Sequence, residues 1–141
     1  QKKGLHVEFE VADAMNLPYP DATFDIASIS FGIRNVDDVS IALSEMARVV
    51  KPGGRVMILE FGQPKGLIGM IYNLYSKYII PFLGGLLTGN KEAYSYLPRT
   101  AAIFPCRKDF LSLMSKTGRY SEVSYKELTF GISFLYTGVV R

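Results

Sequence analysis

The sequence predicts an α/β domain in which a parallel sheet ends in an antiparallel pair of strands. Two observations predict this fold class. An apolar run at Phe24–Phe31, an amphipathic helical segment, a Pro-Gly-Gly turn and a second apolar run at Arg55–Phe61 follow in the order of a βαβ unit, whose strands are parallel. The last strand-like segments, Glu122–Leu128 and Ile132–Val140, are separated by Thr129–Gly131 alone, a spacing typical of antiparallel neighbours.

The first part of the chain predicts a short strand, a loop and a buried strand. Val7–Val11 alternates weakly between apolar and polar residues, which predicts the short strand. Asp13–Asp21 is rich in proline, asparagine and aspartate and predicts the loop. Phe24–Phe31 is apolar along most of its length, as expected for a central strand covered on both faces.

The helix of the βαβ unit is expected to begin after Asp37 or Asp38, either of which can cap it. Its apolar residues recur at the 3.6-residue spacing of a helix, and charged residues occupy the opposite side. The apolar positions are Ala42, Leu43, Met46, Val49 and Val50. Lys51-Pro52-Gly53-Gly54 is expected to end the helix, because proline cannot continue it and glycine supplies the turn.

Leu67–Leu87 is almost entirely apolar or aromatic, with Lys77 its only charged residue. Its length would allow it to cross a membrane, but Pro81, Gly84-Gly85 and Lys77 disfavour that interpretation. A helical cover over a binding pocket and a core helix are the alternatives that remain. Glu92–Phe104 predicts a further helix with a bend at Pro98, and Arg107–Lys116 predicts a short amphipathic helix.

Composition limits the possible functions. The chain has 141 residues, of which 48% are hydrophobic and 21% charged, enough for one folded domain. A net charge of +3 without a basic cluster does not predict nucleic-acid binding, although it suits an anionic membrane surface as well as simple solubility. Cys106 and His6 are the only cysteine and histidine, so no disulfide can form within the chain and no metal site is expected. Neither residue lies in a context typical of a nucleophile.

Ligands of open α/β sheets bind at the carboxyl ends of the parallel strands. Three segments leave such ends in the predicted fold: Asp13–Met15, Phe31–Val36 and Phe61–Pro64. We therefore expect the functional residues in these segments.

Motifs spread over nearly the whole chain resemble one known family. They include Ala12-Asp13-Ala14-Met15-Asn16-Leu17-Pro18, Phe31-Gly32-Ile33-Arg34-Asn35-Val36, Val50-Lys51-Pro52-Gly53-Gly54, Leu59-Glu60-Phe61, Tyr75-Ser76, Pro81 and Tyr94-Ser95-Tyr96-Leu97. Together they resemble the ubiquinone/menaquinone biosynthesis C-methyltransferases, a family of class I S-adenosylmethionine (SAM)-dependent methyltransferases. The first and third motifs occur throughout the class I enzymes, whereas the second, combined with the tyrosine-containing segments, is much narrower.

The resemblance implies a partial class I methyltransferase fold of the Rossmann-like type. Residues 1–141 would form the C-terminal part of a single methyltransferase domain, with a helical substrate-cover insertion at about 65–104. No Gly-x-Gly-x-x-Gly motif follows a strand, so we expect the family's N-terminal βα units to be missing from this chain. In the family these strands lie between Val7–Val11 and the strand holding Phe24–Ser30, which predicts a gap in the sheet.

The resemblance implies SAM as the cofactor and three residues that bind it. The carboxylate of Asp13 and the backbone of Ala14 would hold the adenine, whose amine is a donor and whose ring nitrogen is an acceptor. The alternative for Asp13 is an aspartate that caps a turn. Ser30 would line the cofactor pocket, and the alternative is a small polar residue satisfied within the sheet.

The resemblance implies that Arg34 and Asn35 are catalytic. Methylation of a quinol ring carbon is favoured when a ring hydroxyl ionises, and a nearby guanidinium stabilises the phenolate. Arginine does not deprotonate, so a water is the expected proton acceptor, while Asn35 can hydrogen-bond a ring oxygen. In the alternative, Arg34 forms a structural ion pair and Asn35 caps the helix near Asp37. Glu60 could bind a substrate oxygen, but pairing with Arg34 is the favoured interpretation.

The predicted function is C-methylation of a polyprenylated benzoquinol or naphthoquinol with SAM, by a peripheral enzyme. We expect it on the cytoplasmic face of a bacterial membrane or the matrix face of the mitochondrial inner membrane. Its expected partners are the polyprenyl quinol, the membrane surface, and a second copy or a quinone-biosynthesis complex, with no nucleic acid. Two alternatives stay open: a methyltransferase for another lipid or phenol, and a non-catalytic pseudoenzyme that binds quinone or protein.

Overall fold

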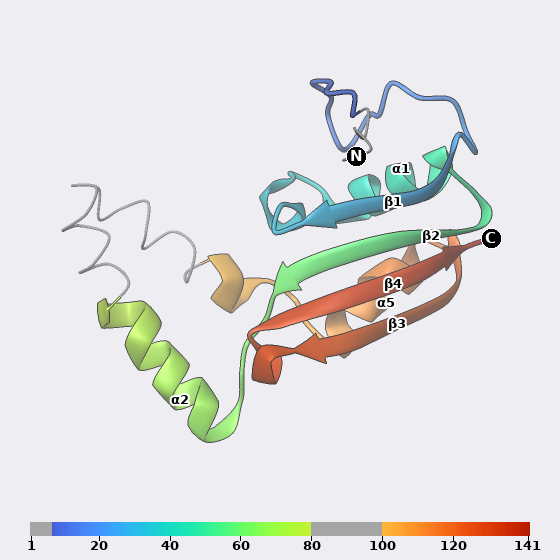
Figure 1. Cartoon of the computed structure of the whole chain (residues 1–141). Coiled ribbons are helices and arrows are strands. Elements are labelled where there is room, and N and C mark those ends of the chain that lie inside the picture. Colours follow the sequence, from blue (N-terminus) through green and yellow to red (C-terminus); the bar gives the residue numbers. More distant parts are fainter. Residues whose placement is uncertain (1–6, 80–99) are drawn as a thin grey trace, which may run out of the picture.

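The computed structural model describes residues 7–79 and 100–141, which form a mixed sheet with helices against it (Figure 1). Within these residues the sheet has four strands in the order β1-β2-β4-β3. Their bounds are Phe24–Ser30 for β1, Val50–Phe61 for β2, Tyr120–Leu128 for β3 and Ser133–Val140 for β4. The β1–β2 pair is parallel and the other two pairs are antiparallel, which confirms the predicted α/β fold class.

Two helices cover one face of this sheet. The first, α1 (Val39–Val49), connects β1 to β2, and α5 (Lys108–Lys116) precedes β3. Figure 1 shows both helices on the same side of the sheet, and their buried side chains share one apolar core with the strands. The largest members of that core are Tyr136, Phe110, Phe134, Ile33, Leu43, Ile58 and Met114.

Helix α1 begins where the sequence predicts. Asp38 is its cap, because the Asp38 carboxylate accepts hydrogen bonds from the backbone N–H groups of Ser40 at 2.8 Å and Ile41 at 3.1 Å. The predicted apolar side of the helix is buried against the sheet. Its last turn passes directly into β2, and the Pro-Gly-Gly segment lies within the range of that strand. The parallel register is irregular there, with Phe24 opposite Val50 but Ile26 opposite Arg55.

Two predictions for the N-terminal part were wrong. Val7–Val11 is not a strand, and the side chains of Phe9 and Val11 are 94% and 102% exposed. An extended segment needs a neighbouring strand to satisfy its backbone, and none of the described residues provides one for this segment. The strand β1 is an edge strand and not a central one, because β2 is its only described neighbour, and Ile26 is 56% exposed.

The apolar segment after β2 forms α2 (Gly66–Leu74) and continues as a π-helical turn, η2 (Tyr75–Ile79). Figure 1 shows α2 extending away from the sheet, and only Gly69 is buried along it, so the core-helix interpretation of this part was wrong. The remainder of the predicted segment, 80–87, lies outside the described residues. So do residues 92–99 of the next predicted helix, including its bend, whereas residues 100–103 are helical. Helix α5 and the antiparallel pair β3–β4 confirm the predictions for the C-terminal part.

Candidate functional site

The parallel pairing of β1 and β2 brings their carboxyl ends to the same edge of the sheet. Ser30 lies opposite Leu59 in the register, and the next residue, Phe31, donates its backbone N–H to the Leu59 carbonyl at 2.8 Å. The rings of Phe31 and Phe61 are 4.4 Å apart between centroids. Two of the three predicted segments, Phe31–Val36 and Phe61–Pro64, therefore leave the sheet side by side.

A strained turn directs the first of these segments. Phe31 has a φ of 55°, a backbone conformation that residues with a Cβ rarely adopt. The chain then enters η1, a 3-10 turn at Ile33–Asn35 in which Ile33 is fully buried. Arg34 returns toward the strand end and donates from Nη1 to the Phe31 carbonyl at 2.6 Å. Strain of this kind is often found at functional sites, where the surrounding fold enforces it.

Arg34 and Glu60 form a buried ion pair at this edge. Arg34 Nη1 lies 2.7 Å from Glu60 Oε1, and the side chains are 7% and 1% exposed. The same carboxylate oxygen accepts the backbone N–H of Phe61 at 2.8 Å, and the guanidinium carbon of Arg34 lies 5.4 Å from the centroid of the Phe61 ring. The expected pairing of Glu60 with Arg34 is thus confirmed.

The ion pair is incompletely hydrogen-bonded within the described part of the chain. Arg34 Nε and Glu60 Oε2 are both buried, and neither has a hydrogen-bond partner in the described ranges. Both hydrogen bonds that Arg34 makes with described residues use its Nη1 nitrogen. Buried polar atoms without partners are rare in proteins and carry a cost of about 1–3 kcal/mol each. This edge of the sheet therefore has unused capacity for hydrogen bonding.

The other predicted residues of this edge lie close by in the chain. Ser30 is exposed at the end of β1. Asn35 is exposed as well, and its backbone N–H donates to the Gly32 carbonyl at 3.0 Å. The alternative in which Asn35 caps α1 was wrong, because that cap is Asp38.

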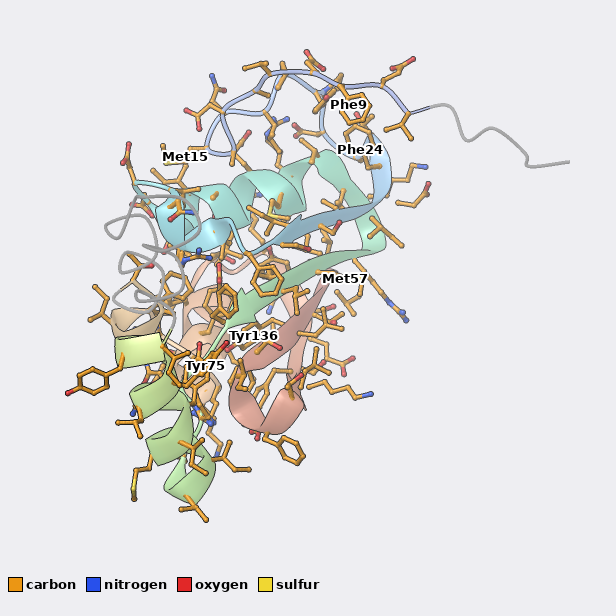
Figure 2. The ribbon with its side chains drawn as sticks, turned by 60° about the vertical axis from the view of Figure 1, so that its left-hand side comes forward. Phe9, Met15, Phe24, Met57, Tyr75 and Tyr136 are labelled. Carbon is orange, nitrogen blue, oxygen red and sulfur yellow. The ribbon has the colours of Figure 1, made fainter. Side chains whose placement is uncertain are left out.

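Asp13 and Ala14 belong to a loop that docks on α1. Asp13 Oδ1 accepts the Met15 backbone N–H at 2.8 Å, which is the turn-capping contact weighed as an alternative for this residue. The backbone nitrogen of Asp38, the cap of α1, lies 3.3 Å from the sulfur of Met15, and Figure 2 shows Met15 beside α1. The loop is thus held near the start of α1, while Asp13 itself remains exposed.

A cavity of about 220 Å³ opens beyond the end of β2. It is lined by Gly62, Gln63, Pro64, Tyr72, Asn73, Ser76, Ala101 and Ala102. Gln63 joins its walls, since Gln63 Nε2 donates to the carbonyls of Ala102 at 2.7 Å and Phe104 at 3.2 Å. Sequence reasoning did not single out Gln63, although its position after a parallel strand was a usable signal.

Burial affects the titratable side chains of this region. The Tyr72 hydroxyl is partly buried in α2, and desolvation raises its pKa above the usual value. Among residues 7–79 and 100–141, no three cysteine, histidine or acidic side chains gather in a way that could hold a metal ion.

The fold is similar to that of SAM-dependent methyltransferases. A SAM-dependent methyltransferase of Methanosarcina mazei superposes with a TM-score of 0.59 at 24% identity, covering 100% of this chain and 71% of that one. The methyltransferase (CMeT) domain of the citrinin polyketide synthase gives a TM-score of 0.60 at 18% identity, covering 94% of this chain and 32% of that one.

The family follows from the sequence comparisons. Residues 1–140 match the ubiE/COQ5 methyltransferase family, and the chain belongs to this family. It is 53% identical to the ubiquinone/menaquinone biosynthesis C-methyltransferase UbiE of Bdellovibrio bacteriovorus, over 100% of this chain and 60% of the relative. It is 44% identical to the demethylmenaquinone methyltransferase of Thermus thermophilus, over 98% of this chain and 62% of the relative. The predicted family is thereby confirmed, and the chain spans about three fifths of the length of these relatives.

Proposed function

We propose that this chain acts in the SAM-dependent C-methylation of a polyprenylated benzoquinol or naphthoquinol. The observation that carries the proposal is the buried Arg34–Glu60 pair, which the Phe31–Val36 motif holds at the carboxyl edge of the parallel strands. The family and the names of its relatives support quinone-ring methylation as the reaction. The pair supplies a fixed cation where such a sheet binds its ligands.

The donor and acceptor groups of the chain fit the adenine end of SAM. Asp13 uses one carboxylate oxygen for the Met15 N–H, so the exposed carboxylate keeps a second oxygen for the adenine amine. The backbone of Ala14 and the exposed hydroxyl of Ser30 are the other proposed contacts. When bound, SAM supplies the methyl group and a thioether leaving group.

Arg34 would make the ring of the substrate nucleophilic. A phenol titrates near pH 10 when unperturbed, and a neighbouring guanidinium lowers that pKa by stabilising the phenolate. The guanidinium itself cannot accept the proton, which we assign to a water. Asn35 would hydrogen-bond the same or the neighbouring ring oxygen, so that the ring carbon is held in line for attack.

We propose that the helical segment at about 65–104 covers the substrate and contacts the membrane surface. No helix within residues 7–79 and 100–141 combines the length and apolar character needed to cross a bilayer. The side chains of Leu67, Met70, Ile71 and Leu74 are instead 60% to 69% exposed along α2. Such an apolar helix surface suits a peripheral enzyme that takes a polyprenyl quinol from the bilayer, on either membrane face named above. A second copy or a quinone-biosynthesis complex remains a proposed partner.

The catalytic proposal is tested in a fusion in which the N-terminal region of the Bdellovibrio relative precedes this chain, called the completed protein below. The fusion is assayed with both quinol classes. Arg34→Lys should lower kcat about a hundred- to a thousandfold, because lysine cannot reproduce a planar donor aimed at a ring oxygen. Its rate should keep rising to higher pH than the unsubstituted protein's, with SAM affinity unchanged. Normal turnover in folded Arg34→Lys protein would contradict the catalytic role. Turnover of other phenols alone would contradict the substrate class.

The membrane proposal is tested with vesicles that contain anionic lipid. Replacing Leu67, Met70 and Leu74 together by asparagine should abolish co-sedimentation of the chain, because the apolar surface of α2 is lost. Phe130→Asn is the matched control, since Phe130 is 73% exposed in η3 (Thr129–Gly131). Equal binding of the triple variant and the control would rule out α2 as the membrane contact.

A further inference from the structure

We infer that Glu60 is the positioning residue of this site, acting on the reaction through Arg34. The inference rests on the proposed function and extends it, because it assigns a role to a residue that contacts neither the substrate nor the cofactor in that proposal. Glu60 is 1% exposed, and its Oε1 lies 2.7 Å from Arg34 Nη1.

The structure holds the Glu60 carboxylate more firmly than the Arg34 guanidinium. Glu60 belongs to β2, which pairs with β1 on one side and with β4 on the other. Its Oε1 is fixed by the Phe61 backbone N–H at 2.8 Å, so the acceptor cannot follow Arg34 if that side chain moves. Arg34 lies on a three-residue turn, whose backbone is not held by strand pairing as that of Glu60 is. Glu60 is therefore the rigid partner, and its carboxylate orients the Arg34 guanidinium.

Two further contacts define the direction in which the guanidinium points. Arg34 Nη1 also donates to the carbonyl of Phe31 at 2.6 Å, and the guanidinium lies over the ring of Phe61. One nitrogen is thus held by two acceptors, while the buried Nε has no partner among the described residues. Removing the carboxylate would leave a buried cation with one fixed acceptor, a carbonyl on a strained turn. The guanidinium would then lose its defined orientation.

An ion pair that served stability alone would not need this arrangement. Buried ion pairs contribute little net stability, because the desolvation of both groups offsets their attraction. Here Glu60 Oε2 also has no partner among residues 7–79 and 100–141, which adds cost rather than stability. A pair with this cost, placed at the ligand-binding edge, is explained by the orientation it imposes on Arg34.

The first arm of the test does not depend on activity. The side-chain Nε–H signal of Arg34, identified by its loss in Arg34→Lys, is followed by NMR in the ¹⁵N-labelled completed protein. In the unsubstituted protein it should exchange slowly with solvent, and in Glu60→Gln at least tenfold faster. Glu127→Gln is the control, because Glu127 Oε2 lies 3.8 Å from Arg107 Nε in a separate ion pair. Unchanged exchange in Glu60→Gln would overturn the inference.

The second arm uses turnover in the same protein. Glu60→Gln should lower kcat at least tenfold with the KM for SAM unchanged, and Glu60→Asp should recover part of the loss. Since Glu60 acts through Arg34, the double variant Arg34→Lys/Glu60→Gln should be no slower than Arg34→Lys alone. Additive losses, or a lower Tm with normal kcat in Glu60→Gln, would overturn the inference. If the unsubstituted protein methylates neither quinol, the proposed function fails, while the NMR arm still decides the role of Glu60.

Discussion

Asp13 combines a structural contact and a proposed binding role in one side chain. Its Oδ1 accepts the Met15 N–H at 2.8 Å, and the Asp13 backbone carbonyl accepts the Asn16 N–H at 3.0 Å, so a tight turn surrounds the carboxylate. The turn holds the carboxylate in place without using both of its oxygens. Capping a turn and binding adenine are therefore compatible at this residue, and two substitutions can separate them.

Asp13→Asn should weaken SAM binding as much as Asp13→Ala in the completed protein. The asparagine amide keeps one oxygen for the Met15 N–H but presents a donor to the adenine amine, which is also a donor. Loss of a hydrogen bond to a charged group costs about 1.5–3 kcal/mol, so the KM for SAM should rise roughly ten- to a hundredfold with little change in kcat. Titration calorimetry and initial rates provide the measurement. An Asp13→Asn protein with normal affinity would show that Asp13 serves the turn alone.

At the scale of elements, α1 organises the loop that precedes β1. Arg48, near the end of the helix, donates to the carbonyls of Leu17 at 3.0 Å and Tyr19 at 2.8 Å. It also pairs with Asp21 at 2.7 Å and with Glu45 at 2.8 Å. Glu45 in turn accepts the Leu17 backbone N–H, and its hydrogen bond with Arg48 lowers the Glu45 pKa. One helical arginine thus holds a loop that has no regular strand pairing within the described part of the chain.

Arg48→Met should detach this loop while leaving the apolar stem on the helix. We expect a lower free energy of unfolding, because several hydrogen bonds of a charged group disappear together, with part of their energy screened at the surface. Urea denaturation of the chain measures this loss. Hydrogen exchange should also become faster at residues 13–21. Lys51→Met is the control, since Lys51 makes an exposed pair with Asp25 at 2.8 Å. Equal losses in both variants would contradict the anchoring role.

At the scale of the whole molecule, two tyrosines connect the helices to the sheet. The Tyr120 hydroxyl donates to the Leu43 carbonyl of α1 at 2.7 Å, and the Tyr136 hydroxyl accepts the Arg107 backbone N–H at 2.8 Å, just before α5. Both side chains are at most 4% exposed. Burial raises the pKa of each phenol above its usual value, because the phenolate would be poorly solvated in the core.

These raised pKa values predict that the chain loses stability in alkali. Below the unfolded pKa of about 10 both phenols are protonated in either state, and their contribution to stability is complete. Above it the unfolded chain releases protons that the folded core retains, so the free energy of unfolding falls as the pH rises. Tyr120→Phe should cost about 1 kcal/mol near neutral pH but flatten this decline. Urea denaturation between pH 8 and about 11 measures both effects. If the free energy of unfolding of Tyr120→Phe fell as steeply with pH as that of the unsubstituted chain, the raised pKa would not belong to Tyr120.

Several elements of this protein could be predicted from the sequence alone, because local residue patterns determine them. The Asp38 cap, the buried side of α1 and the antiparallel pair at the C-terminal end follow from residue spacing and turn residues, which act within a few positions of the chain. The sequence likewise predicted that the segments after β1 and β2 would share one edge of the sheet. It placed Arg34 and Glu60 at that edge, because the parallel order of a βαβ unit follows from topology, and it favoured their pairing.

Contacts between distant parts of the chain decided the rest. Val7–Val11 and β1 carry strand-like sequences. Within the described part of the chain, however, Val7–Val11 has no neighbouring strand and β1 lies at the edge of the sheet, because a strand depends on partners that its own residues do not encode. Arg34 Nε and Glu60 Oε2, which have no partner among the described residues, belong to a pair 26 positions apart in the chain. The hydrogen bonds from the Gln63 side chain reach backbone carbonyls as far as 41 positions away. Such distances and orientations exist only in the folded chain, since packing and not pattern sets which atom of a side chain meets which partner.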